Sequence, residues 1–155
     1  MKEVILLKNG EIALKGLNRR TFEEMLTKSI RRAVRSAGEF TVERAPSTMY
    51  VIPQEDTCDM DKAVHRLQHV FGVVALTRAC VIEKDLEAIK IASAEYLQED
   101  LESVRTFKVE AKRADKKFPF ISPEIAREVG GYLLEKFPHL VVDVQNPDLT
   151  VVVEV

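Results

Sequence analysis

Apolar residues follow two different spacings along the chain, and each spacing predicts one kind of secondary structure. Lys2–Lys8 is a short apolar run rich in β-forming residues, which predicts a buried strand. From residue 22 to residue 37 apolar positions recur every three or four residues, which predicts an amphipathic helix. Asn18 or Thr21 is the expected cap of this helix, Thr21 as part of a capping box, and Gly38 is its expected end.

The following segment predicts a hairpin, a second helix and a closing strand. Phe40–Arg44 and Thr48–Ile52 alternate apolar and polar residues on either side of a proline-containing turn. Asp59 or Asp61 is expected to start a helix with one buried stripe, and a later glycine is expected to end it. Val73–Ile82 is the predicted closing strand. The resulting order, β-α-β-β-α-β, is the ferredoxin-like arrangement.

A second unit with alternating helices and strands is expected after this strand. Asp85 is the expected cap of its first helix, and Arg105–Ala111 alternates as a strand with Phe107, Val109 and Ala111 on one face. Ser122, followed by a proline and a glutamate, is a typical helix start. Two further apolar runs predict strands over Leu140–Val144 and Leu149–Val155.

The predicted fold class is therefore α+β, with a ferredoxin-like domain over residues 1–75 and an α/β domain over residues 76–155. Gly130 and Gly131 lie inside the last predicted helix, where each costs about 1 kcal/mol of helix propensity. We therefore expect another backbone to approach them closely. The sequence ends at Val155 inside a strand-like run, which predicts that it is part of a longer protein.

Composition narrows the class of protein. The 155 residues are 46% hydrophobic and 31% charged, which is typical of a soluble globular protein. No apolar run approaches the roughly 20 residues of a membrane-spanning helix, and the N-terminus lacks a signal-peptide pattern. Cys58 and Cys80 are isolated from each other, so we expect two reduced thiols in a cytoplasmic protein.

Charge is segregated along the chain although its net value is only −2. Residues 2–37 contain nine Lys or Arg and four Glu, a net of +5, and residues 105–120 contain six cations and two acids, a net of +4. The rest of the chain therefore carries −11. Two local positive fields favour capture of a polyanion, although runs of charge are also common on ordinary solvated surfaces.

The segment 112–120, KRADKKFPF, combines four cations with two aromatic residues in front of a helix. Cations neutralise phosphates, and an exposed ring can stack on an unpaired base. The backbone amides at the helix start near Ser122 suit a phosphate. Phe118 and Phe120 have two alternative roles, stacking on bases or anchoring the loop in the core.

The segment 10–20, GEIALKGLNRR, places cations near the start of the first helix. It is not a P-loop, because five residues rather than four separate its glycines and Leu17 follows the second one. Contact with a phosphate backbone is the expected role of its cations. His65 and His69 have the spacing of a metal-ligand pair, but no third ligand is evident, so we expect both to be solvated and no metal to bind.

Residues 10–20 and 107–131, together with VFGV at 70–73, resemble the N-terminal ferredoxin-like and THUMP domains of the tRNA 4-thiouridine synthetases. These tRNA sulfurtransferases are also tied to thiamine biosynthesis. The resemblance extends over essentially the whole chain and implies that the segment positions the tRNA acceptor end and contains no catalytic residue. The residues expected to contact RNA are Lys8, Lys15, Arg19, Arg20, Lys112, Arg113, Lys116, Lys117, Phe118 and Arg127.

The same resemblance implies features that the 155 residues do not contain. The family continues into a PP-loop domain with an SGG-x-DS motif, which binds ATP, and ATP and Mg²⁺ are implied for the full-length protein. A sulfur donor such as a cysteine desulfurase is implied as a partner of the full-length protein. A homodimer is considered apart from the resemblance, as one possible assembly, and no membrane partner is expected. Three alternatives remain open: a THUMP module of another RNA-modifying enzyme, a small acylphosphatase-like enzyme, and a protein-interaction fragment.

Overall fold

The computed structural model describes residues 2–9, 19–45, 48–70 and 73–155, and the chain divides into two compact units, Met1–Val81 and Ile82–Val155. The first unit ends at Val81 rather than at the expected residue 75, which lies inside strand β4 (Val73–Val81). The whole of β4 belongs to the first unit because it pairs with the first strand along its length. None of the described helices is long and apolar enough to cross a bilayer.

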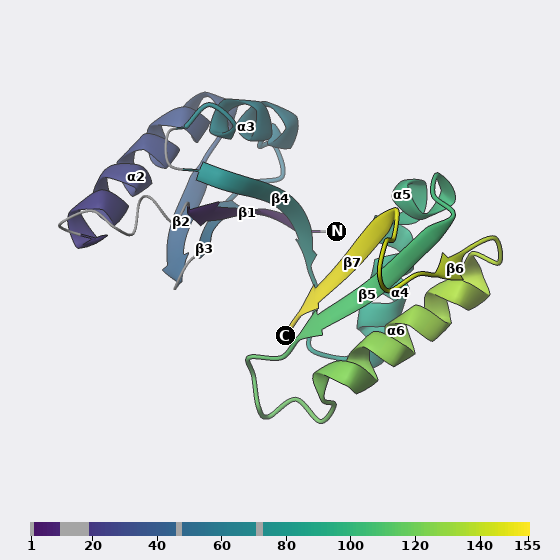
Figure 1. Ribbon diagram of the computed structural model, residues 1–155. Coiled ribbons are helices and arrows are strands. Elements are labelled where there is room, and N and C mark those ends of the chain that lie inside the picture. The colour runs from purple at the N-terminus through teal and green to yellow at the C-terminus, as the bar shows by residue number, and fades with distance from the viewer. Residues whose placement is uncertain (1, 10–18, 46–47, 71–72) are drawn as a thin grey trace. The chain divides into compact units, whose positions relative to one another are not determined.

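The first unit is a four-stranded antiparallel sheet with two helices, in the strand order β2-β3-β1-β4 (Figure 1). This order and the β-α-β-β-α-β succession confirm the predicted ferredoxin-like arrangement. The strands are β1 (Lys2–Asn9), β2 (Phe40–Ala45), β3 (Thr48–Pro53) and β4. The helices are α2 (Arg19–Val34), which the 3₁₀ turn η1 (Arg35–Ala37) extends, and α3 (Met60–Leu67).

The core of the first unit lies between the helices and the sheet. Alternate residues of a strand point to one face, so Ile5 and Leu7 of β1 are both fully buried. Ile30 is fully buried on the apolar stripe of α2, and burial of such a side chain contributes about 2 kcal/mol. The other buried members of this cluster are Leu26, Val34, Ala37, Met49, Val51, Ala63 and Leu67.

Helix boundaries in the first unit differ from the expected ones at two points. α2 begins at Arg19, so the predicted cap at Thr21 is wrong, and Asn18 lies outside the described residues. The prediction for α3 is confirmed, because the Asp59 side chain accepts a hydrogen bond from the backbone N–H three residues later, at 3.0 Å. α3 ends at Leu67, earlier than expected. Gly38 has φ +137°, and a Cβ added there would lie 2.7 Å from Sγ of Cys58.

The second unit is a three-stranded parallel sheet with helices, in the strand order β6-β5-β7 (Figure 1). Its strands are β5 (Thr106–Lys112), β6 (Val141–Val142) and β7 (Leu149–Glu154), and its helices are α4 (Leu86–Tyr96), α5 (Gln98–Glu102) and α6 (Ser122–Lys136). Helix α6 connects the parallel strands β5 and β6, as parallel pairing requires. Phe107, Val109 and Ala111 all join one core cluster, as predicted, with Ile125, Val129 and Leu133 of α6.

Several local predictions in the second unit are confirmed and others are wrong. Asp85 caps α4 by accepting from the backbone N–H of Ala88 at 3.0 Å, as expected. Ser122 is the first helical residue of α6 rather than its cap, because Ile121 occupies the cap position. In the described ranges of the chain, no other backbone approaches the glycine pair closely. A Cβ on Gly130 would meet a side-chain atom of β5 at 3.7 Å, and one on Gly131 would meet none of the described atoms within 4 Å.

Candidate nucleic-acid interface

The loop between β5 and α6 folds around the carboxylate of Asp115. Asp115 Oδ1 accepts a hydrogen bond from the backbone N–H of Lys117 at 3.0 Å, and Oδ2 lies 2.7 Å from Nζ of Lys84. The hydrogen bond from Lys84, followed by that from the Lys117 backbone, lowers the pKa of Asp115 below its ordinary value. The acid of this basic loop is therefore occupied by partners within its own unit.

Phe118 anchors this loop in the core of the second unit. Its side chain is only 5% exposed, and its ring centroid lies 5.8 Å from that of the half-buried Phe120. A ring buried to this extent offers almost no face to a base. The structure therefore favours the anchoring alternative and removes Phe118 from the set of candidate RNA contacts.

The cations of the loop differ in how far they are free to meet a ligand. Arg113 donates a hydrogen bond from Nη1 to the backbone carbonyl of Phe118 at 3.0 Å and is partly buried, and Lys112 lies 4.0 Å from a carboxylate oxygen of Glu154. Lys116, Lys117 and, on α6, Arg127 are exposed, and within the described parts of the chain their charged groups have no ion-pair partner. These last three are the strongest candidates for phosphate contact in this unit.

The start of α6 is less suited to a phosphate than the sequence suggested. The Glu124 carboxylate accepts a hydrogen bond from the backbone N–H of Ile121 at 3.1 Å. This carboxylate places a negative charge at the helix start and satisfies one of the free amides there. The expectation that the amides near Ser122 hold a phosphate is therefore not supported.

Two of the four cations predicted in the first unit have described side chains. Lys8, near the end of β1, is exposed. Arg20 forms an exposed ion pair with Glu24 at 3.3 Å, and such pairs contribute little and exchange readily. Arg19 is placed by its backbone as the first residue of α2, and Lys15 lies outside the described residues.

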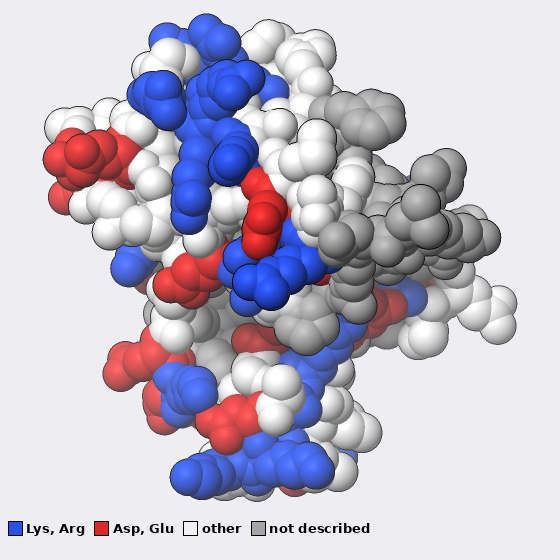
Figure 2. Space-filling model, turned by 90° about the vertical axis from the view of Figure 1, so that its left-hand side faces the viewer, with Lys and Arg blue, Asp and Glu red and all other residues white. Residues whose placement is uncertain are grey.

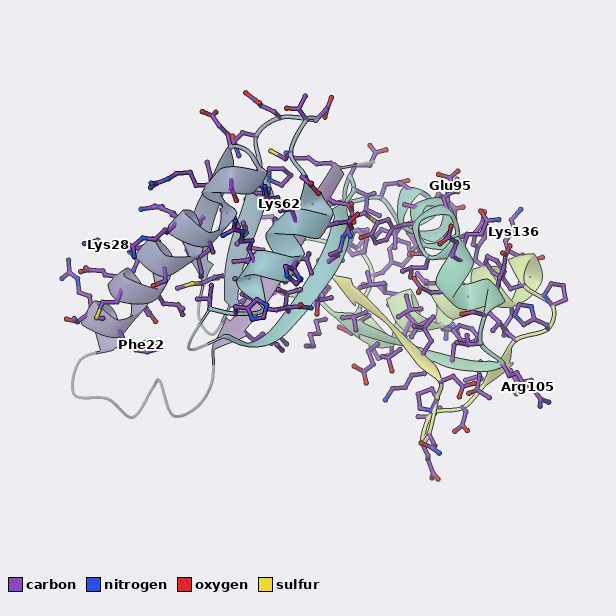
Figure 3. The ribbon with its side chains drawn as sticks, turned by 90° about the horizontal axis from the view of Figure 1, so that it is seen from above. Phe22, Lys28, Lys62, Glu95, Arg105 and Lys136 are labelled. Carbon is purple, nitrogen blue, oxygen red and sulfur yellow. The ribbon has the colours of Figure 1, made fainter. Side chains whose placement is uncertain are left out.

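A larger group of cations in the first unit was not singled out from the sequence. It lies on the second half of α2, on η1 and on α3, and Figure 2 shows Lys and Arg side chains gathered on this face of the protein. Figure 3 shows α2 and α3 side by side, with Lys28 on α2 and Lys62 on α3. The signal in the sequence was the helical spacing, which places Lys28 and Arg32, and Arg31 and Arg35, one turn apart. The exposed basic residues of this group are Lys28, Arg31, Arg32, Arg35, Lys62 and Arg66.

His65 and His69 lie on this same face, and their placement agrees with the expectation that they are solvated. Both are exposed, and their rings meet edge to face with centroids 5.3 Å apart. In the part of the chain that the structure describes, no group of three or more His, Cys, Asp or Glu is placed to hold a metal ion.

The one described glycine with a positive φ does not form a cradle for the phosphates of ATP. An ATP cradle uses glycines whose open side faces the phosphates. Gly38 has a positive φ, but its open side is filled by Cys58, so it serves packing. No step of a reaction is therefore assigned to ATP within this chain.

Family models match each unit separately. Residues 4–77 match the ThiI ferredoxin-like domain, and residues 83–155 match the THUMP domain. The chain therefore belongs to the proteins that join a ThiI ferredoxin-like domain to a THUMP domain, which confirms the resemblance and the α+β fold class expected from the sequence.

Relatives of the chain are named more specifically than these two domains, as probable tRNA sulfurtransferases. It is 44% identical to a probable tRNA sulfurtransferase of Acetivibrio thermocellus and 43% identical to one of Alkaliphilus metalliredigens. All of this chain is covered in both comparisons, and it spans 40% of the length of each relative. A crystal structure of a 4-thiouridine synthetase–RNA complex with bound ATP superposes over 100% of this chain and 39% of that one, with a TM-score of 0.83 and 34% identity.

Proposed function

We propose that this chain is the tRNA-binding part of a tRNA sulfurtransferase that makes 4-thiouridine, and that it holds the acceptor end of the tRNA. The observation that carries the proposal is the match of the whole chain to a 4-thiouridine synthetase whose crystal structure contains RNA. The exposed cations Lys116, Lys117 and Arg127 supply the chemistry that an RNA backbone requires.

The proposed mechanism is positioning. Cations neutralise phosphates and fix the register of the RNA without reading its sequence. RNA recognition of this kind depends on shape and backbone contacts, so one uridine is presented at a fixed distance from the held end. The residues of this chain would therefore bind and orient the tRNA, and the chemistry would take place elsewhere in the full-length protein.

The remaining parts of the proposal concern the full-length protein. In it, ATP with Mg²⁺ would activate the target uridine. A cysteine desulfurase is the expected sulfur donor, part of the sulfur would pass to thiamine biosynthesis, and the protein would act in the cytoplasm, with a homodimer as the expected assembly.

The test is a titration of the chain with tRNA and with tRNA that lacks its single-stranded 3′ tail, over a series of salt concentrations. We expect tight binding of intact tRNA, weaker binding without the tail, and an affinity that falls steeply as salt rises. The double variant Lys116→Gln/Lys117→Gln should bind more weakly and with a salt slope reduced by about two, because each cation that neutralises a phosphate contributes about one to the slope.

The matched control is Arg44→Gln/Lys136→Gln, which removes two exposed cations outside the proposed interface. Its affinity and salt slope should equal those of the wild type. An affinity that does not respond to salt, or equal losses in the two double variants, would overturn the proposal.

A further inference from the structure

A groove of about 780 Å³ lies between α2 and α3 on the first unit. Ser29 and Ala33 lie one helical turn apart on α2, and their small side chains leave the space open. Most of the surrounding side chains are basic. The lining residues are Ser29, Arg32, Ala33, Lys62, His65, Arg66, His69 and Val70.

Among the residues that the structure describes, the lining of this groove contains three full positive charges and no acid. Lys62 and Arg66 lie one turn apart on α3, and Arg32 faces them from α2. The two histidine rings add N–H groups, which can donate hydrogen bonds to an anionic oxygen in either protonation state. The groove therefore presents hydrogen-bond donors from both walls.

The acid nearest in sequence to these cations is held by another residue. Asp61 Oδ1 lies 2.6 Å from Nη1 of Arg78 on β4, and the same guanidinium binds Glu3 of β1 at 2.9 Å. Hydrogen bonds to Glu3 and then to Asp61 raise the pKa of Arg78. Because Arg78 engages Asp61, this carboxylate does not neutralise the groove.

The cations of the groove repel one another in the free protein, and this repulsion lowers its stability. On a helix, like charges three or four residues apart repel each other, and Arg32 lies at these spacings from Arg35 and Lys28. At the amino end of the same helix, by contrast, Arg20 is paired with Glu24. A favourable interaction with the helix dipole offsets part of the repulsion, but an acid at one of these positions would relieve it directly. An anion in the groove would relieve it as well.

We propose that this groove binds the phosphodiester backbone of RNA, at a site separate from the loop at 112–120. The inference rests on the proposed function, because it assigns to the first unit a share of the same tRNA. Phosphate oxygens would accept hydrogen bonds from Arg32 on one wall and from Lys62 and Arg66 on the other. A two-walled site of this kind fixes the position of the backbone more closely than cations on one surface.

The test compares the double variant Arg32→Gln/Arg66→Gln with the wild-type chain and with the control Arg44→Gln/Lys136→Gln, each titrated with tRNA across a salt series. We expect a loss of about tenfold in affinity near physiological salt and a salt slope reduced by about two in the groove variant. The loss should be the same with tRNA that lacks its 3′ tail. Its thermal unfolding midpoint should equal or exceed that of the wild type, because repulsion has been removed.

The outcomes separate this inference from the proposed function. If the wild-type chain binds tRNA and the groove variant binds it with the same affinity and slope, the groove inference is overturned and the proposed function stands. A loss that vanishes on tail-less tRNA contradicts a separate site. A loss accompanied by a lower unfolding midpoint shows a structural role instead. Absence of tRNA binding by the wild-type chain overturns both.

Discussion

The Arg113 guanidinium donates a hydrogen bond to the backbone carbonyl oxygen of Phe118 at 3.0 Å, across the base of the loop between β5 and α6. The Phe118 ring is buried in the core of the same unit. Arg113 and Phe118, which were both predicted from the sequence to contact RNA, therefore stabilise the conformation of the loop. Their substitution should change stability, whereas substitution of Lys116 and Lys117 should change RNA affinity alone.

Phe118→Ala should lower the free energy of unfolding of the second unit by about 3–5 kcal/mol, because it leaves a cavity in the core. Phe118→Leu, which retains most of the apolar volume, should cost much less. Urea denaturation followed by circular dichroism measures both. If Phe118→Ala left stability unchanged and abolished tRNA binding, the ring would have to be a stacking surface after all.

Arg113→Lys should lower the free energy of unfolding by roughly 1–2 kcal/mol, because the variant removes a charge-assisted hydrogen bond to a partly buried carbonyl. The variant keeps its positive charge, so the salt slope of tRNA binding should not change. Denaturation and a salt series on the same variant provide the two measurements. Unchanged stability with weaker tRNA binding would indicate instead that the Arg113 guanidinium contacts the RNA directly.

Most of the fold was predictable because local signals agreed with it. The strands of the first unit, the hairpin and the caps at Asp59 and Asp85 follow from patterns spanning a few residues. The start of α6 and the end of the first unit were less predictable. The start of α6 shifts because Glu124 reaches back to Ile121, and the boundary between the units follows from the pairing of β4 with β1.

Gly131→Ala should raise the free energy of unfolding by about 0.5–1 kcal/mol. Gly131 lies inside α6, where alanine is the better helix former, and an added Cβ meets no atom within 4 Å. Thermal or urea unfolding tests this directly. Destabilisation would indicate that something packs against this position in solution.

Gly38→Ala should have the opposite effect and lower the free energy of unfolding by about 1–3 kcal/mol. Its φ of +137° is strained for any residue with a side chain, and the new Cβ would lie 2.7 Å from Sγ of Cys58. The double variant Gly38→Ala/Cys58→Ala should recover the part of the loss that comes from the clash with sulfur. Full recovery would show that the backbone angle contributes nothing.

Stability at low pH should depend on Asp148. Its carboxylate accepts hydrogen bonds from the backbone N–H groups of Thr106 at 3.2 Å and Arg105 at 3.3 Å, and these bonds lower its pKa in the folded protein. The unfolded chain therefore binds a proton more readily than the folded chain does. The stabilisation is present above the ordinary aspartate pKa of about 3.9 and is lost as the pH falls through the lower folded value.

The measurement for Asp148 is the urea unfolding midpoint between pH 5 and pH 2, for the wild type and for Asp148→Asn. The asparagine variant does not titrate at this position, so its midpoint should fall less over this range. Part of the fall should remain, because Asp115 and Glu110 also have lowered pKa values. Parallel curves for the two proteins would contradict the role of Asp148.

The candidate site was less predictable than the fold. The charge count identified the two basic segments, but it could not distinguish a cation held by a neighbour from one that is free. Arg113 and Lys116 are near neighbours in the chain, yet one is bound to a backbone carbonyl and the other is exposed. The groove could not be predicted from the sequence, because it depends on the packing of α2 against α3. This packing brings Arg32 and Arg66 to the same groove although the two are far apart in sequence.

The position of β1 between β3 and β4 has a consequence for synthesis on the ribosome. The first sheet is complete only when β4, the last strand of its unit, has been made and can pair with β1. In the second unit, β5 can pair with β7 only after β7 has been made. Domains generally fold as units, the N-terminal one first during translation. A nascent chain that has emerged as far as Val81 therefore contains the complete first sheet and every residue of the groove, before any strand of the second sheet has been made.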